Sequence, residues 1–221
     1  MVESDGRRKL GLDDAYALET PEDSRRLYKD WAQTYESDFV TSHHYVIHQH
    51  VADTYVEAVN GALDAPVLDV GCGTGIVGVA LAAAGCSKID GADIAPEMLN
   101  EAAKKTMNGT AVFGQLLEVD LMEPIDVADD AYSGVVSAGT FTHGHVGPEA
   151  LRELVRIVKP GGLLVLAINS GHFTATGFAT VLDELEAAGR VANRTVRTVN
   201  MYDGGDSAHA ADTADIAILQ I

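Results

Sequence analysis

Short apolar runs alternate along the chain with longer stretches in which apolar residues recur every three or four positions. A short apolar run is typical of a buried strand, and the longer spacing is typical of an amphipathic helix. We therefore expect strands at 67–70, 89–93, 111–119, 134–138 and 163–169, and helices at 76–84, 96–106, 148–158 and 177–188. This alternation predicts an α/β fold, with a doubly wound and mostly parallel sheet between two helical layers (αβα).

The two ends of the chain depart from this alternation. Residues 1–60 contain two amphipathic helical stretches and no strand pattern. At the other end, two β-rich runs, 191–202 and 213–221, follow each other without an intervening helix, which predicts an antiparallel hairpin at the edge of the sheet. We expect a single domain overall, with a helical N-terminal segment at 1–60 and the sheet domain at 61–221.

The charge of the chain narrows the class of partner. The formal net charge is −18 at pH 7, and 47% of the 221 residues are hydrophobic. Nucleic acids and anionic membranes are bound through surplus Lys and Arg, so we expect neither as a partner. The 2 cysteines form no disulfide framework, and we find no signal-peptide core and no stretch long enough to span a membrane. We expect a cytoplasmic protein.

The segment VLDVGCGTGIVG contains two overlapping glycine patterns. Gly71, Gly73 and Gly75 form G-x-G-x-G, whereas Gly73, Gly75 and Gly78 form the G-x-G-x-x-G of dinucleotide sites. In a dinucleotide fold the first glycine directly follows the strand, and here that glycine is Gly71. The dinucleotide pattern therefore starts two residues late. Asp69, inside the strand, disfavours a pyrophosphate but suits S-adenosylmethionine, which carries a sulfonium, an amine and no phosphate.

Acidic and small residues end the later strands. Asp93 ends the second predicted strand, where a carboxylate can accept both hydroxyls of a ribose, an arrangement that fits either cofactor. Asp120 follows the third strand and can accept the amino group of an adenine. The small residues at 137–140 end the fourth strand and leave room for a methionine chain and an incoming acceptor.

In this order, the segments resemble the class I S-adenosylmethionine-dependent methyltransferases. The resemblance rests on VLDVGCGTG, GADIAPEML, LEVDL, SGVVSAGTF and LVRIVKPGGLLVL, between about residues 66 and 169. Together with LYKDWAQTYESDF, GTFTHGHVGPEAL and LDELEAAG, they make the chain similar to the Williams–Beuren syndrome region methyltransferase-like proteins. Lys29 replaces the first acidic residue that is usual in that subgroup, and Glu36 replaces the second. The segments on the substrate side identify no acceptor.

The resemblance implies a Rossmann-like fold and a site for S-adenosylmethionine. The residues expected to bind this cofactor lie in the first helix, in the glycine loop and at the ends of the strands. They are Tyr28, Trp31, Tyr35, Asp69, Gly71, Cys72, Gly73, Gly75, Asp93, Ile94, Met98, Asp120, Leu121 and Ala138.

Two interpretations apply to Tyr28, Trp31 and Tyr35, which we expect on one face of the first helix. Aromatic stripes of this kind usually pack in a core. The resemblance implies instead that residues 1–60 form a lid or cap, with Tyr35 nearest the methionine end of the cofactor. An aromatic face near a sulfonium has a physical basis, because cations favour π faces.

The 8 histidines raise the question of a metal or a base. The pairs at 48/50 and 143/145 are compatible with metal ligands, but cysteines are few and no HExxH spacing occurs, so we expect no metal site. His143 follows the fourth strand, near where ligands bind in such sheets, and histidine is a common general base. His143 is therefore our candidate catalytic residue, the alternative being a loop histidine that shapes the pocket.

The sequence favours in-line methyl transfer from S-adenosylmethionine to a small-molecule acceptor. Residues 138–141 lack the Asn/Asp-Pro-Pro-aromatic loop of nucleobase methyltransferases, and the double-Glu loop of arginine methyltransferases is absent. Two alternatives stay open: an NAD-dependent oxidoreductase that uses the later glycines, and an S-adenosylmethionine-binding protein without transfer activity. The sequence leaves the acceptor atom and the oligomeric state open.

Overall fold

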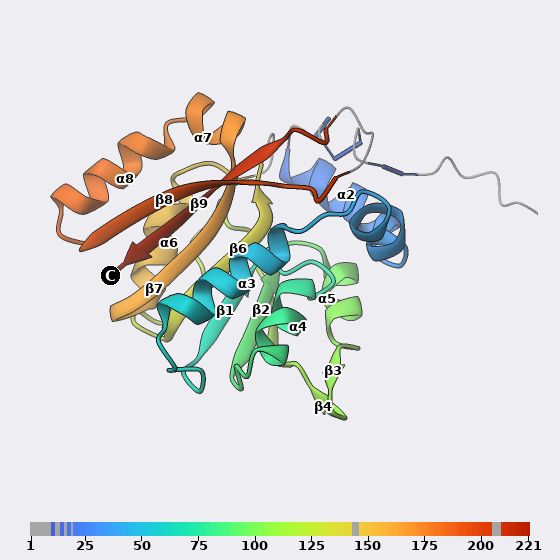
Figure 1. The fold of residues 1–221 in the computed structure, drawn as a ribbon, viewed down its shortest axis with the longest axis horizontal. Coiled ribbons are helices and arrows are strands. Elements are labelled where there is room, and N and C mark those ends of the chain that lie inside the picture. Colours follow the sequence, from blue (N-terminus) through green and yellow to red (C-terminus); the bar gives the residue numbers. More distant parts are fainter. Residues whose placement is uncertain (1–9, 12–13, 16, 19, 143–145, 205–208) are drawn as a thin grey trace, which may run out of the picture.

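A seven-stranded sheet forms the centre of the computed structural model, which describes residues 10–11, 14–15, 17–18, 20–142, 146–204 and 209–221 (Figure 1). The strand order is β5-β2-β1-β6-β7-β9-β8. These strands are β1 (Val67–Val70), β2 (Ile89–Asp93), β5 (Phe113–Glu118), β6 (Tyr132–Phe141), β7 (Val158–Asn169), β8 (Asn193–Asn200) and β9 (Thr213–Gln220). All pairs up to β7 are parallel, and β9 runs antiparallel to both β7 and β8. The predicted doubly wound sheet with its antiparallel C-terminal hairpin is confirmed, and β8 is the strand at the edge.

Helices cover both faces of this sheet. They are α3 (Ile47–Ala58), α4 (Ile76–Ala83), α5 (Pro96–Ala102), α6 (Ala150–Ile157), α7 (Ser170–Ala175) and α8 (Phe178–Ala187). A further helix, α2 (Pro21–Trp31), packs against α5. Successive residues of a strand point to opposite faces. Val136 accordingly packs in the core cluster with α3 and α4, and its neighbour Val135 packs in the cluster with α6 and α8. The three-layer αβα arrangement is confirmed.

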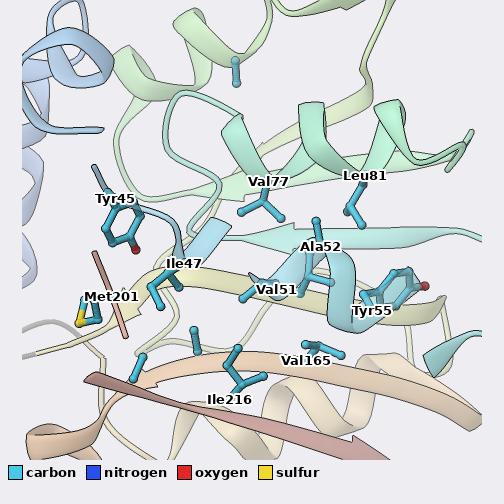
Figure 2. Packing of buried hydrophobic residues seen from close by; sticks show 14 of the residues in the cluster. Tyr45, Ile47, Val51, Ala52, Tyr55, Val77, Leu81, Val165, Met201 and Ile216 are labelled. Atoms are coloured by element: carbon cyan, nitrogen blue, oxygen red, sulfur yellow. The ribbon is translucent and has the colours of Figure 1, made fainter. Parts of the chain in front are cut away.

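Helix α3 belongs to the sandwich itself. It lies across β6 and β7 and beside α4, with Val51, Ala52 and Tyr55 buried between them (Figure 2). Gly134 in β6 makes this close contact possible, because a side chain there would collide with the ring of Tyr55. The second helical stretch of the N-terminal segment is therefore part of one helical layer.

The segment that precedes α3 pairs with the segment that follows β8. Tyr45 forms an antiparallel bridge with Tyr202, which follows β8. The N–H of Val46 donates to the carbonyl of Met201 at 3.1 Å, and the N–H of Asp203 donates to the carbonyl of His44 at 2.9 Å. The segment between α2 and α3 is thus fixed to the C-terminal hairpin.

Helix α2 has the start signals of its sequence. The side chain of Thr20 accepts a hydrogen bond from the N–H of Asp23, and Pro21 occupies the first helical turn. The helix ends at Trp31, and a short π-helical turn, η1 (Glu36–Thr41), follows. The expected single helical face through Tyr35 is therefore interrupted by a turn.

Other parts of the secondary structure also differ from the prediction. Helix α5 ends at Ala102, and a small hairpin, β3 (Thr106–Met107) and β4 (Thr110–Ala111), precedes β5. Its turn residues, Asn108 and Gly109, both have positive φ, as a tight hairpin turn requires. The Lys-Pro-Gly-Gly segment lies inside β7, where we expected a turn, and α7 was not expected. Within the described ranges, no helix combines the length and the apolar character that crossing a membrane requires.

Candidate active site

A cavity lies at the carboxyl ends of the parallel strands, where β1 and β6 are neighbours. At this point the order of the strands reverses, and ligands of open α/β sheets bind in the resulting crevice. The cavity is lined by α2, by the loops after β1, β2 and β5, and by the end of β6. Its lining includes Tyr28, Tyr35, Tyr45, Gly71, Cys72, Gly73, Thr74, Asp93, Ile94, Met98, Asp120, Leu121, Ala138, Gly139, Thr140 and Val146.

The glycine loop begins directly where β1 ends, at Val70. Gly71, Gly73 and Gly75 all have positive φ (63°, 54° and 91°), which is unfavourable for residues with a Cβ. Gly71 also faces Thr140 so closely that a Cβ would collide with the threonine hydroxyl, whereas a Cβ on Gly73 would meet no atom within 4 Å. The pattern that begins at Gly71, G-x-G-x-G, therefore contains the glycines whose backbone shapes this loop.

Gly78 has a packing role. It lies in α4, and a Cβ there would collide with the ring of Phe113 on β5. Gly75, at the start of the same helix, is close to that ring as well, with a Cβ position 2.7 Å from Phe113 Cε2. Gly78 therefore permits close packing of the helix on the sheet. Gly75 belongs to the loop but does not line the cavity.

Asp93 connects the second strand to the glycine loop. One carboxylate oxygen accepts a hydrogen bond from the N–H of Gly73 at 2.8 Å, and the other accepts one from the N–H of Ala95 at 2.9 Å. The side chain lines the cavity, and burial raises the pKa of its carboxyl while the hydrogen bonds from Ala95, Gly73 and Ile94 oppose the rise. Each oxygen keeps a lone pair that can accept a further hydrogen bond from a ligand hydroxyl.

Asp69 lies beneath the loop, outside the cavity lining. It is fully buried on the strand face of Val67, toward α4, and neither oxygen has a hydrogen-bond partner of ordinary geometry among the described residues. Burial raises the pKa of its carboxyl well above the ordinary value. The nearby N–H of Gly78 lowers this pKa, and the charge of Asp93 raises it further. Burial thus disfavours the charged form of Asp69, and the N–H of Gly78 partly offsets this.

Asp120 lines the cavity in the loop after β5. Its Oδ1 accepts a hydrogen bond from the N–H of Met122 at 3.0 Å, and its Oδ2 pairs with Arg25 Nη2 of α2 at 3.2 Å. This ion pair joins α2 to the wall of the cavity. Sequence reasoning did not identify Arg25.

The three aromatic residues of the expected stripe lie together but have different positions. The rings of Trp31 and Tyr35 meet edge to face at 5.2 Å, and those of Tyr28 and Trp31 stack at 6.4 Å. Tyr28 and Tyr35 line the cavity, and Trp31, 1% exposed, packs behind them in the core. Both interpretations of the stripe therefore have a structural counterpart.

Tyr45 and Thr74 are cavity residues that sequence reasoning missed. The Tyr45 hydroxyl and the Thr74 hydroxyl are buried and have no hydrogen-bond partner among the described residues. Thr74 lies within the quoted glycine motif and could have been inferred from it. No local pattern identifies Tyr45, because its position depends on the bridge to Tyr202.

The remaining residues that were predicted to bind the cofactor all line the cavity. They are Cys72, Ile94, Met98, Leu121 and Ala138. Burial is the main cause that raises the pKa of the Cys72 thiol, which is therefore a neutral side chain in this wall. His143 lies outside the described residues.

Comparisons with known proteins agree with this geometry. A family model described as a methyltransferase domain matches residues 67–162. Methyltransferase-like protein 27 of Homo sapiens is 32% identical over 167 residues, which are 73% of this chain and 65% of that protein. The chain thus spans only 65% of the length of this curated relative.

Solved structures share the fold at low identity. The magnesium protoporphyrin IX methyltransferase of Synechocystis PCC 6803, solved with bound SAM, has a TM-score of 0.62 at 19% identity, covering 93% of this chain and 99% of that chain. The [4+2]-cyclase SpnF has a TM-score of 0.64 at 17% identity, covering 92% of this chain and 97% of that chain. These likenesses show the fold. The domain match over residues 67–162 and the likeness to the human relative support a class I S-adenosylmethionine-dependent methyltransferase.

Proposed function

We propose that the cavity binds S-adenosylmethionine and that the chain transfers its methyl group to a small-molecule acceptor. One observation carries the proposal: Asp93, the positive-φ glycine loop and Asp120 meet in one cavity at the switch point of the sheet. In this arrangement Asp93 binds the ribose and Asp120 binds the adenine amino group. Asp69 lies behind the loop, outside the cavity lining.

The charges of the cavity favour a cationic ligand over a pyrophosphate. Among the described lining residues the only charged side chains are Asp93 and Asp120. A dinucleotide brings two phosphates, whose charge these carboxylates repel. A sulfonium and an amine are attracted by the same groups. The acidic lining and the glycine pattern that begins at Gly71 both favour the methyltransferase over the NAD-dependent oxidoreductase.

The methionine end of the cofactor is assigned to the aromatic wall. Tyr28 and Tyr35 present ring surface to the cavity from the N-terminal segment. Burial raises the pKa of both phenols, so both stay neutral and offer π faces to a cation. Of the predicted lid or cap at residues 1–60, we assign this role only to the part that precedes α3, because α3 belongs to a helical layer of the sheet domain. Trp31 supports the two tyrosines from the core.

When bound, S-adenosylmethionine supplies an electrophilic methyl group on a sulfonium leaving group, open to in-line displacement. The chain then has to align the acceptor and exclude water. The small residues Ala138 and Gly139 leave space for the acceptor beside the glycine loop. A base is needed only for an acceptor that must lose its proton, and His143 stays our candidate for that role.

The test is transfer of labelled methyl from S-adenosylmethionine in a whole cell extract, which is then separated into small molecules, protein and nucleic acid. We expect a labelled product below about 1 kDa, a range set by pockets that enclose drug-sized ligands. Label in protein or nucleic acid would overturn the small-molecule assignment. Binding of S-adenosylhomocysteine without any transfer would favour the S-adenosylmethionine-binding protein without activity. Cytoplasmic location is part of the proposal, supported by two buried free cysteines.

A further inference from the structure

The cavity extends beyond the glycine loop to the end of β6. There its wall is formed by Ala138, Gly139 and Val146, with Tyr35 and Tyr45 contributed by the N-terminal segment. No described residue of this wall carries a charge, since Asp93 and Asp120 lie at the ends of other strands. This part of the cavity is therefore uncharged and mainly apolar, its polar side chains being the two phenols and Thr140, whose hydroxyl donates to the carbonyl of Val70.

Tyr45 is held firmly in this wall. Its side chain is 4% exposed, and its ring packs against Phe39 at 5.0 Å, Tyr202 at 5.9 Å and His48 at 6.1 Å. The bridge to Tyr202 fixes its backbone. The phenol is therefore positioned before any ligand arrives.

The Tyr45 hydroxyl lies over Gly139. A Cβ on Gly139 would be 3.0 Å from this oxygen, and Gly139 has a φ of 79°, so both its backbone and its neighbour favour glycine. The hydroxyl has no hydrogen-bond partner within the described part of the chain. A buried hydroxyl without a partner is unfavourable, and a ligand that supplies an acceptor atom removes that cost.

We propose that Tyr45 is a residue that binds the methyl acceptor, its hydroxyl donating a hydrogen bond to an uncharged oxygen of that molecule. The inference rests on the proposed function and adds the chemical class of the acceptor. Burial, with the neighbouring Tyr202 and Tyr28, raises the pKa of the Tyr45 phenol, so it donates a hydrogen bond and does not act as a base at neutral pH.

The surroundings of Tyr45 define that class further. A carboxylate or phosphate at this wall would be buried without a cation to pair with, because no described lining residue is a Lys or Arg. It would also share the cavity with two acidic side chains. An aromatic or aliphatic molecule that carries a carbonyl or hydroxyl oxygen meets ring surface and one donor. The acceptor class is therefore a neutral, mainly apolar small molecule with such an oxygen.

The experiment uses the full chain saturated with S-adenosylhomocysteine and ligand-observed NMR. The probes are acetophenone and benzyl alcohol as neutral oxygen compounds, with benzoate and phenyl phosphate as anionic counterparts. Wild type is compared with Tyr45→Phe and with the control Tyr202→Phe, whose ring is a neighbour that does not line the cavity. Thermal unfolding and S-adenosylhomocysteine affinity are measured for each variant.

We expect the neutral probes to bind wild type more tightly than the anions do. Tyr45→Phe should weaken them at least fivefold, as loss of one hydrogen bond predicts, and Tyr202→Phe should change them less than twofold. Equal binding by Tyr45→Phe, a preference for anions, or no binding of neutral probes would overturn the inference. Failure of wild type to bind S-adenosylhomocysteine would overturn the proposed function instead, which separates the two outcomes.

Discussion

The two halves of the cavity are built in different ways. The cofactor half, formed by residues 71–74, Asp93 and Asp120, is held by hydrogen bonds between side-chain oxygens and backbone N–H groups. The acceptor half, formed by Tyr35, Tyr45, residues 138–140 and Val146, is built mainly from aromatic residues and from the end of one strand. Each half contains a buried hydroxyl without a partner in the described part of the chain, that of Thr74 in the first and that of Tyr45 in the second.

The two halves differ in what positions their residues. The cofactor half follows β1, β2 and β5, and hydrogen bonds from backbone N–H groups to Asp93 and Asp120 fix it, so its geometry follows from the sheet. The acceptor half depends on the side chains that the N-terminal segment and the C-terminal hairpin bring together. A change of acceptor therefore needs few substitutions, and a change of cofactor needs a different loop.

The strongest test of the cofactor half is Gly71→Ala. The new Cβ would collide with Thr140 and would hold a positive φ, so we expect a loss of about 3 kcal/mol or more in the free energy of unfolding and no measurable S-adenosylhomocysteine binding. The matched control is Gly73→Ala, which has a positive φ but open space and should cost only about 1–2 kcal/mol. Urea unfolding measures both, and equal losses would contradict the tight fit at Gly71.

Asp93→Ala should reduce S-adenosylhomocysteine affinity about 10- to 100-fold, because a hydrogen bond to a charged group contributes about 1.5–3 kcal/mol. It also removes the two hydrogen bonds to Gly73 and Ala95 that shape the loop. The control is Asp90→Ala on the same strand, whose carboxylate binds Gln115 N–H and Tyr132 and does not line the cavity. Calorimetric titration that gave equal affinities for the two variants would remove the ribose assignment.

Asp69→Asn should stabilise the protein at pH 7 by about 1–3 kcal/mol, because it removes a buried carboxyl without a good partner. The folded-state pKa is raised, so wild type binds more protons when folded and loses stability as pH rises from the ordinary Asp value through the raised pKa. The advantage of the variant should grow over that window and then level off. Urea unfolding from pH 4 to 8 measures it, with exposed Asp126→Asn as the control. A variant less stable than wild type at pH 7 would show that Asp69 has a partner in solution.

The smallest effect is expected at the connection between α2 and the cofactor half. Arg25→Ala removes the ion pair with Asp120, which is partly exposed and should contribute about 1 kcal/mol or less. S-adenosylhomocysteine affinity should fall less than about fivefold, and the difference from wild type should shrink at high salt. Arg26→Ala, on the same helix with its ion pair to Asp23, is the control. A loss far above fivefold would mean that this pair closes the cavity.

Much of the cofactor half could be predicted from the sequence, because its residues lie within short segments that each end a strand. The loop glycines Gly71 and Gly73, together with Asp93 and Asp120, were found in this way and line one cavity. Asp69 belongs to one of these segments and Trp31 to helix α2, but both are buried behind the cavity wall. Their side-chain direction depends on strand register and on the turn after α2, which the pattern of apolar positions does not contain.

In the acceptor half, Tyr35 and residues 138–140 were predicted, whereas Tyr45 and Val146 were missed. Tyr45 reaches the cavity because its backbone pairs with Tyr202, more than half the chain away. The small hairpin of β3 and β4 and the strand through Lys-Pro-Gly-Gly were missed because sheet pairing overrides local turn preference there. Long-range pairing of this kind leaves no periodic signal in a single sequence.

The most direct measurement for the central claim is a calorimetric titration of the full-length wild-type chain with S-adenosylhomocysteine and, separately, with NAD. A cavity with two carboxylates, an early glycine register and no cation among its described lining residues should bind S-adenosylhomocysteine at one site and show no heat with NAD. Binding of NAD without binding of S-adenosylhomocysteine would contradict the assignment of this cavity to a methyl donor.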